Sequence, residues 1–152
     1  MQKITPFLWF NNNLDEAVQF YTQVFKDSKI VSISRMGDQG PAFSAVFQLN
    51  GQDFYALNGG PQFTFNEAVS FFISCENQDE VDYYWQQLTA GGGQPGRCGW
   101  LKDQFGLSWQ VVPVVLNQYL QDKNKDKANK VMQAMMQMDK MDIQQLTDAY
   151  NS

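Results

Sequence analysis

The stretches FLWFNNNLDEAVQFY (residues 7–21) and FFISCENQDEVDYYW (residues 71–85) decide the fold. They align when the chain is shifted by 64 residues, so that Asp15-Glu16 falls on Asp79-Glu80 and the aromatic pairs at the ends of both stretches coincide. Each stretch joins a short apolar run, long enough for one buried strand, to apolar residues at helical spacing. A strand, an acidic helix start and an aromatic pair therefore recur in order, which predicts two copies of one module.

The first copy continues into further strands. Residues 29–36 have the pattern of a strand, and residues 42–49 and 52–57 flank Asn50-Gly51, the strongest two-residue hairpin signal. Asn13 has the residue type and position of an N-cap for the helix that begins at Leu14. We therefore expect a strand, a helix and three strands in this half of the chain.

The second copy repeats the pattern. Residues 69–75 are predicted to form a strand, and the helix after it ends at Gly91-Gly92-Gly93. Residues 97–102 and 107–112 then form a hairpin around a turn, in which Asp103 and Gly106 are best explained as turn residues.

After Pro113 the pattern becomes helical, with apolar residues at helical spacing in the tail and Asp142 placed to cap a last helix. The methionines from Met132 to Met141 either pack the tail on the protein or form an adaptable apolar groove. We expect one domain, residues 1–152, with modules at 1–62 and 63–115 and a helical extension at 116–152.

Composition excludes several classes of function. A net charge of -5 argues against a nucleic-acid groove, which needs clustered Lys and Arg. No apolar run approaches 18 residues, so no membrane partner is expected. The first residues lack the features of a secretory signal, and Cys75 and Cys98 form no CxxC pair, which together predict a cytoplasmic protein with reduced thiols.

Two further totals bear on chemistry. The chain has no histidine, the commonest general base and metal ligand. It has twelve Phe, six Tyr and four Trp, which predict an aromatic interior, a ligand cavity or a subunit interface.

Two segments resemble a known family. CGWLKDQFGLSWQVVP (residues 98–113) is similar to the signature of PhnB-like proteins of the vicinal-oxygen-chelate (glyoxalase/bleomycin-resistance/dioxygenase) superfamily, many of which carry the label 3-demethylubiquinone-9 3-methyltransferase. VMQAMMQMDKMDIQQLTDAY (residues 131–150) resembles the C-terminal extension of the same family. The resemblance implies an α+β fold with two βαβββ modules, each curled as a half-barrel around a pocket. It also implies a homodimer.

The resemblance also implies where a metal would bind. In metal-using members the ligands come from the first strand of each module and from its last strand, and these positions fall on Pro6, Ser70 and Gln110. Proline has no donor side chain, and serine and glutamine are poor ligands for zinc or manganese. We therefore expect no metal. We expect no S-adenosylmethionine either, because Asn11-Asn12-Asn13, not a glycine-rich loop, follows the first strand.

The alternation of side chains along each strand indicates which residues would line the pocket. Gln110 would point inward and hydrogen-bond a ligand, or else be a buried glutamine satisfied by a neighbouring strand. Ser70 and Phe72 share one face of their strand, Ser70 being either a ligand contact or a small filler. On the first strand we expect Leu8 and Phe10 on the Pro6 face. These four residues, with Gln110, are candidate ligand contacts.

Three more candidates complete the set. Trp100 and Lys102 lie in the family motif, and Lys102 either contacts an anionic ligand or flanks the turn. Arg35 would clamp a carboxylate or phosphonate if it faced the cavity, although a surface ion pair is the commoner fate of such an arginine.

The sequence thus favours a protein that binds a small molecule in a metal-free cavity. Two alternatives stay open. One is an enzyme of the superfamily that uses polar side chains or unusual metal ligands, or that performs the methyl transfer of the family label. The other is a structural protein whose aromatic side chains fill its cavity.

Overall fold

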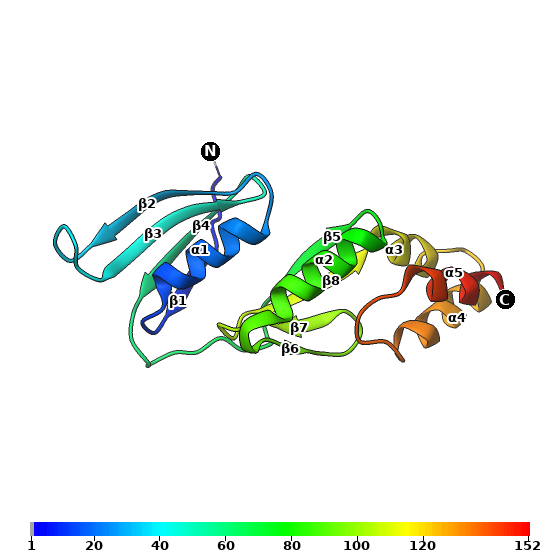
Figure 1. Ribbon diagram of the computed structural model, residues 1–152. Coiled ribbons are helices and arrows are strands. Elements are labelled where there is room, and N and C mark those ends of the chain that lie inside the picture. The colour runs from blue at the N-terminus through cyan, green and yellow to red at the C-terminus, as the bar shows by residue number, and fades with distance from the viewer. Residues whose placement is uncertain (1) are drawn as a thin grey trace. The chain divides into compact units, whose positions relative to one another are not determined.

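The computed structural model describes residues 2–152 and divides the chain into two compact units, Met1–Phe65 and Asn66–Ser152 (Figure 1). Each unit contains a four-stranded sheet, and the second unit also contains the C-terminal helices. The α+β fold class predicted from the sequence is confirmed.

The first unit has one helix and four strands. Its strand order is β1-β4-β3-β2, with β1 parallel to β4 and the other neighbours antiparallel. The hairpin between β3 and β4 turns at Asn50 and Gly51, whose φ angles of 50° and 80° are those of the predicted tight turn. In chain order the elements are β1 (Phe7–Phe10), α1 (Leu14–Val24), β2 (Lys29–Arg35), β3 (Ala42–Leu49) and β4 (Gln52–Asn58).

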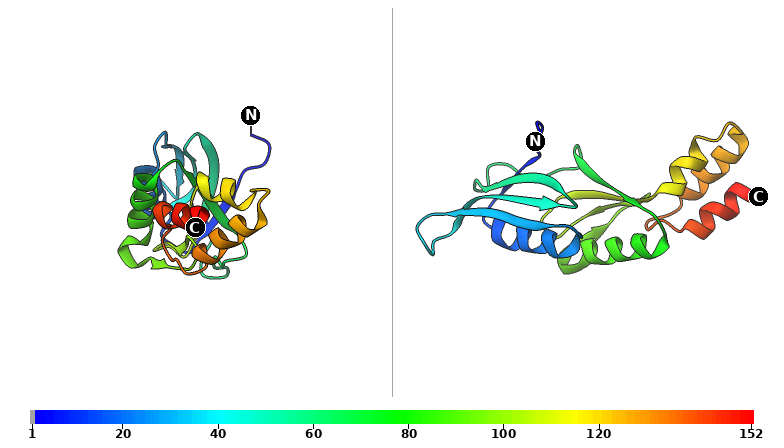
Figure 2. Two further views of the ribbon diagram at one scale, coloured as in Figure 1. Left: turned by 90° about the vertical axis from the view of Figure 1, so that its right-hand side faces the viewer. Right: turned by 90° about the horizontal axis from the view of Figure 1, so that it is seen from above.

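The core of the first unit lies between α1 and one face of its sheet. Register places Leu8 beside Ala56, and Ala56 beside Ala45, so these buried residues share a face. The other face is open, and Phe7 and Tyr55 there are 57% and 41% exposed. The view from above in Figure 2 shows α1 along one side of these strands.

The start of α1 differs from the sequence expectation. Asn13 occupies the N-cap position but its side chain makes no capping hydrogen bond. The backbone N–H of Leu14 instead donates to Oδ1 of Asn58, at the end of β4, over 3.1 Å. A residue from the neighbouring strand satisfies the helix start, and sequence spacing alone does not reveal it.

The second unit repeats the arrangement of the first. Its strand order, β5-β8-β7-β6, matches that of the first unit, and β5 is again parallel to β8. The shared order confirms the predicted duplication of a βαβββ module. The elements are β5 (Ser70–Cys75), α2 (Gln78–Thr89), the 3-10 turn η1 (Ala90–Gly92), β6 (Gln94–Pro95), β7 (Trp100–Lys102) and β8 (Ser108–Pro113).

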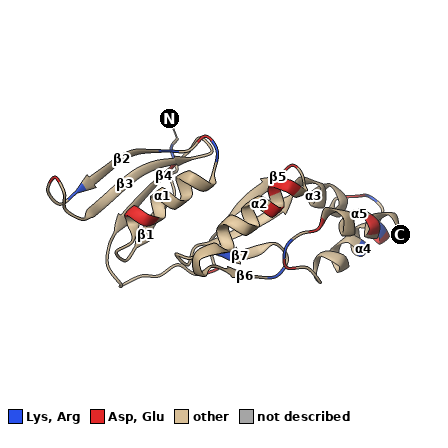
Figure 3. Ribbon diagram, viewed as in Figure 1, with Lys and Arg blue, Asp and Glu red and all other residues tan. Residues whose placement is uncertain are grey.

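The helix α2 is capped and packed as its sequence suggests. The side chain of Asn77 accepts from the N–H of Glu80 (3.0 Å), while the carboxylate of Glu80 accepts from the N–H of Glu76 (3.0 Å). Figure 3 shows the acidic residues at the first turns of both α1 and α2, where the helix dipole favours negative charge. Val81 and Leu88 are fully buried on the sheet side.

The turn between β7 and β8 is built around Asp103, which is 3% exposed. Its carboxylate accepts from the backbone N–H groups of Phe105 (2.8 Å) and Leu107 (3.0 Å) and from the indole N–H of Trp109 (2.8 Å). These bonds agree with the predicted turn role of Asp103.

Three helices follow β8: α3 (Val114–Leu120), α4 (Lys125–Met135) and α5 (Ile143–Asn151). Asp142 caps α5 as predicted, because its carboxylate accepts from the N–H of Gln145 over 3.0 Å. The rings of Tyr119 and Tyr150 stack at 4.3 Å and join α3 to α5. Within residues 2–152, no helix combines the length and apolar character needed to cross a membrane.

Candidate functional site: a cavity between the second sheet and the C-terminal helices

The face of the second sheet that α2 does not cover carries the candidate residues in two rows. Register aligns the side chains across β5, β8 and β7, so each row contains one residue from each strand. The first row is polar and the second is mixed. The rows are Ser70, Ser108 and Lys102, and then Phe72, Gln110 and Trp100.

Gln110 and Ser70 are hydrogen-bonded across neighbouring strands. The amide Nε2 of Gln110 donates to Oγ of Ser70 over 3.0 Å. This bond holds the amide in one orientation, because the donor end is engaged and the acceptor end, Oε1, is left for another group. Ser108, which lies between Ser70 and Lys102 in the first row, is 1% exposed, and its hydroxyl has no hydrogen-bond partner among the described residues.

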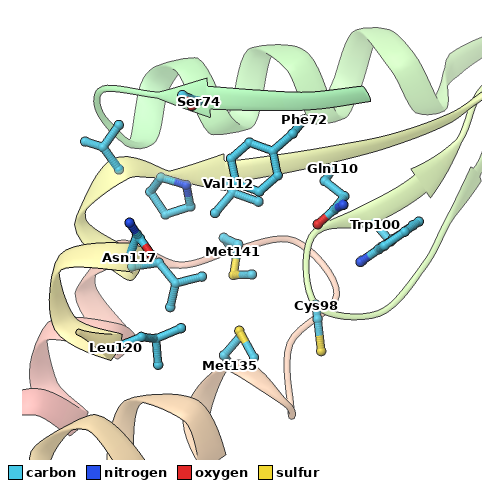
Figure 4. Close-up of a pocket in the computed structure, with 13 residues that line it drawn as sticks. Phe72, Ser74, Cys98, Trp100, Gln110, Val112, Asn117, Leu120, Met135 and Met141 are labelled. Atoms are coloured by element: carbon cyan, nitrogen blue, oxygen red, sulfur yellow. The ribbon is translucent and has the colours of Figure 1, made fainter. Parts of the chain in front are cut away.

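A cavity of about 510 Å³ lies over the second row, between this sheet and the C-terminal helices (Figure 4). This volume is within the range of small-molecule sites. Its walls are mostly apolar, with a few polar groups. The lining residues are Phe72, Ser74, Cys98, Trp100, Gln110, Val112, Pro113, Val114, Leu116, Asn117, Leu120, Met135 and Met141.

The loop between α4 and α5 is held against the turn that precedes β7 by backbone hydrogen bonds, so it forms a wall of the cavity. The N–H groups of Cys98 and Gly99 donate to the carbonyl oxygens of Met138 and Asp139, each over 2.8 Å. Gly99 has φ +83°, and a Cβ there would lie 2.8 Å from the carbonyl oxygen of Val111. Glycine is therefore required where the strand and the loop meet.

Gln78, at the start of α2, holds the next part of the same loop. Its amide nitrogen donates to the carbonyl oxygen of Met141 (3.0 Å), and its amide oxygen accepts from the N–H of Ile143 (2.8 Å). Close by, Lys140 forms an ion pair with Asp82 at 2.8 Å, which lowers the pKa of that carboxyl. The extension is thus attached to both the helix and the hairpin of the second unit.

The two cysteines have different environments. Cys98 lines the cavity, is half-buried and has a left-handed backbone with φ 58°. Cys75 is fully buried, and burial raises the pKa of its thiol to about 12. Both thiols are free. Cys98 is therefore the thiol open to reaction, although no base among the lining residues accompanies it.

The structure brings four of the predicted residues together. Phe72, Trp100 and Gln110 line the cavity, and Ser70 supports Gln110 from the neighbouring strand. Lys102 adjoins them in the sheet, but its ammonium group forms an ion pair with Glu67 and does not line the cavity. The hydrogen bond from Lys102 lowers the pKa of Glu67.

The other three predicted residues lie elsewhere. Leu8 and Phe10 are 6% and 2% exposed in the core of the first unit, on the helix side of their sheet, and neither lines the cavity described above. The strand β1 is one residue out of phase with β5 under the 64-residue shift, and a shift of one residue exchanges the two faces. Arg35 pairs with Asp15 through two hydrogen bonds of 2.8 and 3.1 Å, which raises the pKa of its guanidinium.

The residues at the family's metal positions do not fit a metal. Ser70 and Gln110 are bonded to each other, and Pro6 has no donor side chain. Among residues 2–152 no group of three or more His, Cys, Asp or Glu side chains is placed to hold an ion. A divalent cation needs several anionic or imidazole ligands, which this face does not supply.

Sequence reasoning missed most of the second wall of the cavity. Leu116 and Leu120 come from α3, Met135 is the last residue of α4, and Met141 lies in the loop that is bonded to Cys98 and Gly99. The methionines from Met132 to Met141 were the one sequence feature that pointed to this wall, because adaptable methionine side chains suit an apolar groove. Nothing in the spacing of the residues showed which part of the sheet the tail would cover.

Comparison with known proteins supports the fold and the family. Residues 2–112 match the sequence profile of the family described as 3-demethylubiquinone-9 3-methyltransferase. The search of curated proteins gave no match. A solved structure described as a putative 3-demethylubiquinone-9 3-methyltransferase, PhnB protein, from Bacillus cereus is 36% identical, with TM-score 0.69, over 74% of this chain and 100% of that chain.

Two more distant structures share the fold. Protein PA1353 from Pseudomonas aeruginosa is 20% identical, with TM-score 0.62, over 74% of this chain and 98% of that chain. The fosfomycin resistance protein FosX from Listeria monocytogenes is 18% identical, with TM-score 0.57, over 80% of this chain and 98% of that chain. Both likenesses show the glyoxalase/bleomycin-resistance fold alone.

The family match ends at Val112, one residue before the end of β8. It therefore gives no support to the resemblance noted for residues 131–150, and the whole Bacillus cereus chain is matched by 74% of this one. The C-terminal helices that complete the cavity lie outside the matched region. Over the matched region, the chain belongs to the 3-demethylubiquinone-9 3-methyltransferase (PhnB-like) family.

Proposed function

We propose that this protein binds a small organic molecule in the cavity between β7–β8 and the C-terminal helices, and that it does so without a metal ion. The observation that carries the proposal is the cavity itself. Its volume of about 510 Å³ and its mainly apolar walls with a few polar groups are typical of small-molecule sites.

The apolar walls supply the attraction. Leu116, Leu120, Met135 and Met141 present aliphatic and thioether surface from the extension, and Val112 faces them from β8. Each square ångström of apolar ligand surface removed from water contributes about 25 cal/mol. An apolar molecule that fills this space would therefore bind through the hydrophobic effect, with the polar groups fixing its orientation.

Binding is better supported than catalysis. The lining residues include no histidine or carboxylate to act as a general base, and Cys98 has no base beside it. Methyl transfer from S-adenosylmethionine has no glycine-rich loop to support it, because residues 11–13 after β1 are all asparagine. The family label is therefore not proposed as the activity.

The test is a titration with the neutral dye Nile red, followed by fluorescence. We expect saturable binding to the wild type and at least tenfold weaker binding to Leu120→Trp, whose bulk fills the cavity. Gln118→Trp is the matched control, because Gln118 is exposed on the same helix and does not line the cavity. Equal binding by both variants would overturn the proposal, provided that both unfold at similar temperatures.

We also propose that the protein is a cytoplasmic homodimer. Phe7 and Tyr55 support the dimer, because their rings are in edge contact at 5.8 Å on the open face of the first sheet and are largely exposed. The free thiols of Cys75 and Cys98 suit a reducing compartment. Light scattering after gel filtration should give twice the 17.4 kDa chain mass, and a monomer would contradict this part of the proposal.

A further inference from the structure

Two polar groups that line the cavity lack protein partners and lie side by side. Trp100 and Gln110 are direct partners in the β7–β8 register. Gln110 uses its amide N–H on Ser70, which leaves the oxygen as an acceptor. Among residues 2–152 nothing accepts from the indole N–H of Trp100. Figure 4 shows that oxygen and that nitrogen on the side of the other lining residues.

The pair presents one acceptor and one donor at neighbouring positions. A group that both donates and accepts can satisfy the two together, and a hydroxyl group does so with a single oxygen. The hydroxyl would donate to Oε1 of Gln110 and accept from Nε1–H of Trp100. Burial of a polar group without a hydrogen-bond partner costs free energy. An apolar ligand that covered both groups without bonding to them would therefore bind less tightly than one that bonds to them.

The absence of charged side chains among the described lining residues disfavours an anionic ligand. None of the cavity-lining residues in the described chain carries a charge. The cations close to lining residues in the chain, Arg97, Lys102 and Lys140, are each already paired with a carboxylate. A carboxylate or phosphonate moved into this cavity would lose its hydration without gaining a counter-ion, which makes its transfer unfavourable.

We infer that the ligand is a neutral molecule with a hydroxyl group, an alcohol or a phenol, on an apolar body, and that Gln110 and Trp100 determine this specificity. The inference rests on the proposed cavity-binding function and defines its ligand class. The apolar body would lie against Val112, Leu116 and the methionines of the extension.

Calorimetry on the full chain measures the affinity for four related probes and so tests each contact separately. The probes are para-hexylphenol, para-hexylanisole, para-hexylethylbenzene and para-hexylbenzoate. The anisole keeps the oxygen acceptor and loses the donor, and the ethylbenzene, of similar shape, loses both. We expect affinity to fall about three- to tenfold at each of these two steps, which is the usual value of one neutral hydrogen bond. The benzoate should bind more weakly than the phenol by at least tenfold.

Two variants show which residue is responsible for each loss of affinity. Gln110→Met should abolish the preference for the phenol over the anisole and keep that for the anisole over the ethylbenzene. Trp100→Phe should abolish the second preference. Equal affinity for all four probes, or tightest binding of the benzoate, would overturn this inference and leave cavity binding intact. If neither the probes nor Nile red bind, cavity binding is overturned as well.

Discussion

Gln110 donates a hydrogen bond to Ser70 across neighbouring parallel strands, and the two residues occupy positions where metal-using relatives are expected to place ligands. The amide and the hydroxyl satisfy each other, and neither is an anionic or imidazole group of the kind that binds a divalent cation. The bond engages the amide nitrogen of Gln110 and leaves its oxygen as an acceptor for a ligand in the cavity.

Removal of the Ser70 hydroxyl should free the Gln110 amide. We expect Ser70→Ala to lower the free energy of unfolding by about 0.5–1.5 kcal/mol, the net value of one hydrogen bond. It should also reduce the preference for the phenol over the anisole, because the amide is no longer held in one orientation. Urea unfolding and calorimetry measure the two effects. Ser34→Ala is the control, because Ser34 is an exposed strand serine on β2 that does not line the cavity, and an equal effect there would refute the role of Ser70.

Gln78 should determine how firmly the extension is attached. In Gln78→Ala, the carbonyl oxygen of Met141 and the N–H of Ile143 lose their partner, so the loop before α5 should open more often. We expect faster hydrogen exchange and faster proteolysis at residues 138–143, and weaker Nile red binding. Gln144→Ala serves as the control, because among residues 2–152 the Gln144 side chain bonds only to Asp148, on the same helix. Unchanged exchange in Gln78→Ala would contradict the proposed attachment.

The two thiols should react at different rates. Because burial raises the pKa of Cys75 to about 12, its thiol stays protonated at neutral and mildly alkaline pH, whereas Cys98 is accessible from the cavity. A chromogenic disulfide at pH 8 should therefore modify one thiol per chain quickly, and mass spectrometry should place it at Cys98. Bound ligand should slow this reaction. Rapid modification of Cys75 would contradict the structure.

The same pKa predicts a loss of stability at high pH. The folded state favours the protonated thiol of Cys75, so this contribution is complete below the ordinary thiol pKa of 9.0 and is lost as the pH rises toward about 12. Cys75→Ala should make the free energy of unfolding less dependent on pH in that window. An unchanged pH dependence would show that other groups dominate it.

The elements could be predicted where local signals were strong. The hairpin at Asn50-Gly51 and the cap at Asp142 depend on residues close in sequence, and both were found as expected. The repeated module also emerged, because its helix starts and aromatic pairs keep the 64-residue spacing. Ser70 and Gln110 could be brought together because strand alternation fixes which residues share a face.

The remaining features depend on tertiary contacts. Leu8 and Phe10 lie on the helix face because β1 is one residue out of phase with β5, and the all-apolar run FLWF has no polar residue that would reveal this phase. Asn58, not Asn13, completes the start of α1, and it comes from a strand far away in sequence. The extension's contribution to the cavity depends on Gly99 and Gln78, whose contacts with the loop have no local signature.

The most direct test of a metal-free ligand site is calorimetry of para-hexylphenol binding before and after dialysis of the protein against EDTA. The account predicts the same affinity in both states, with one ligand bound per chain and no change on addition of Mn²⁺, Ni²⁺ or Zn²⁺. Binding that disappears on chelation and returns with one of these ions would contradict it.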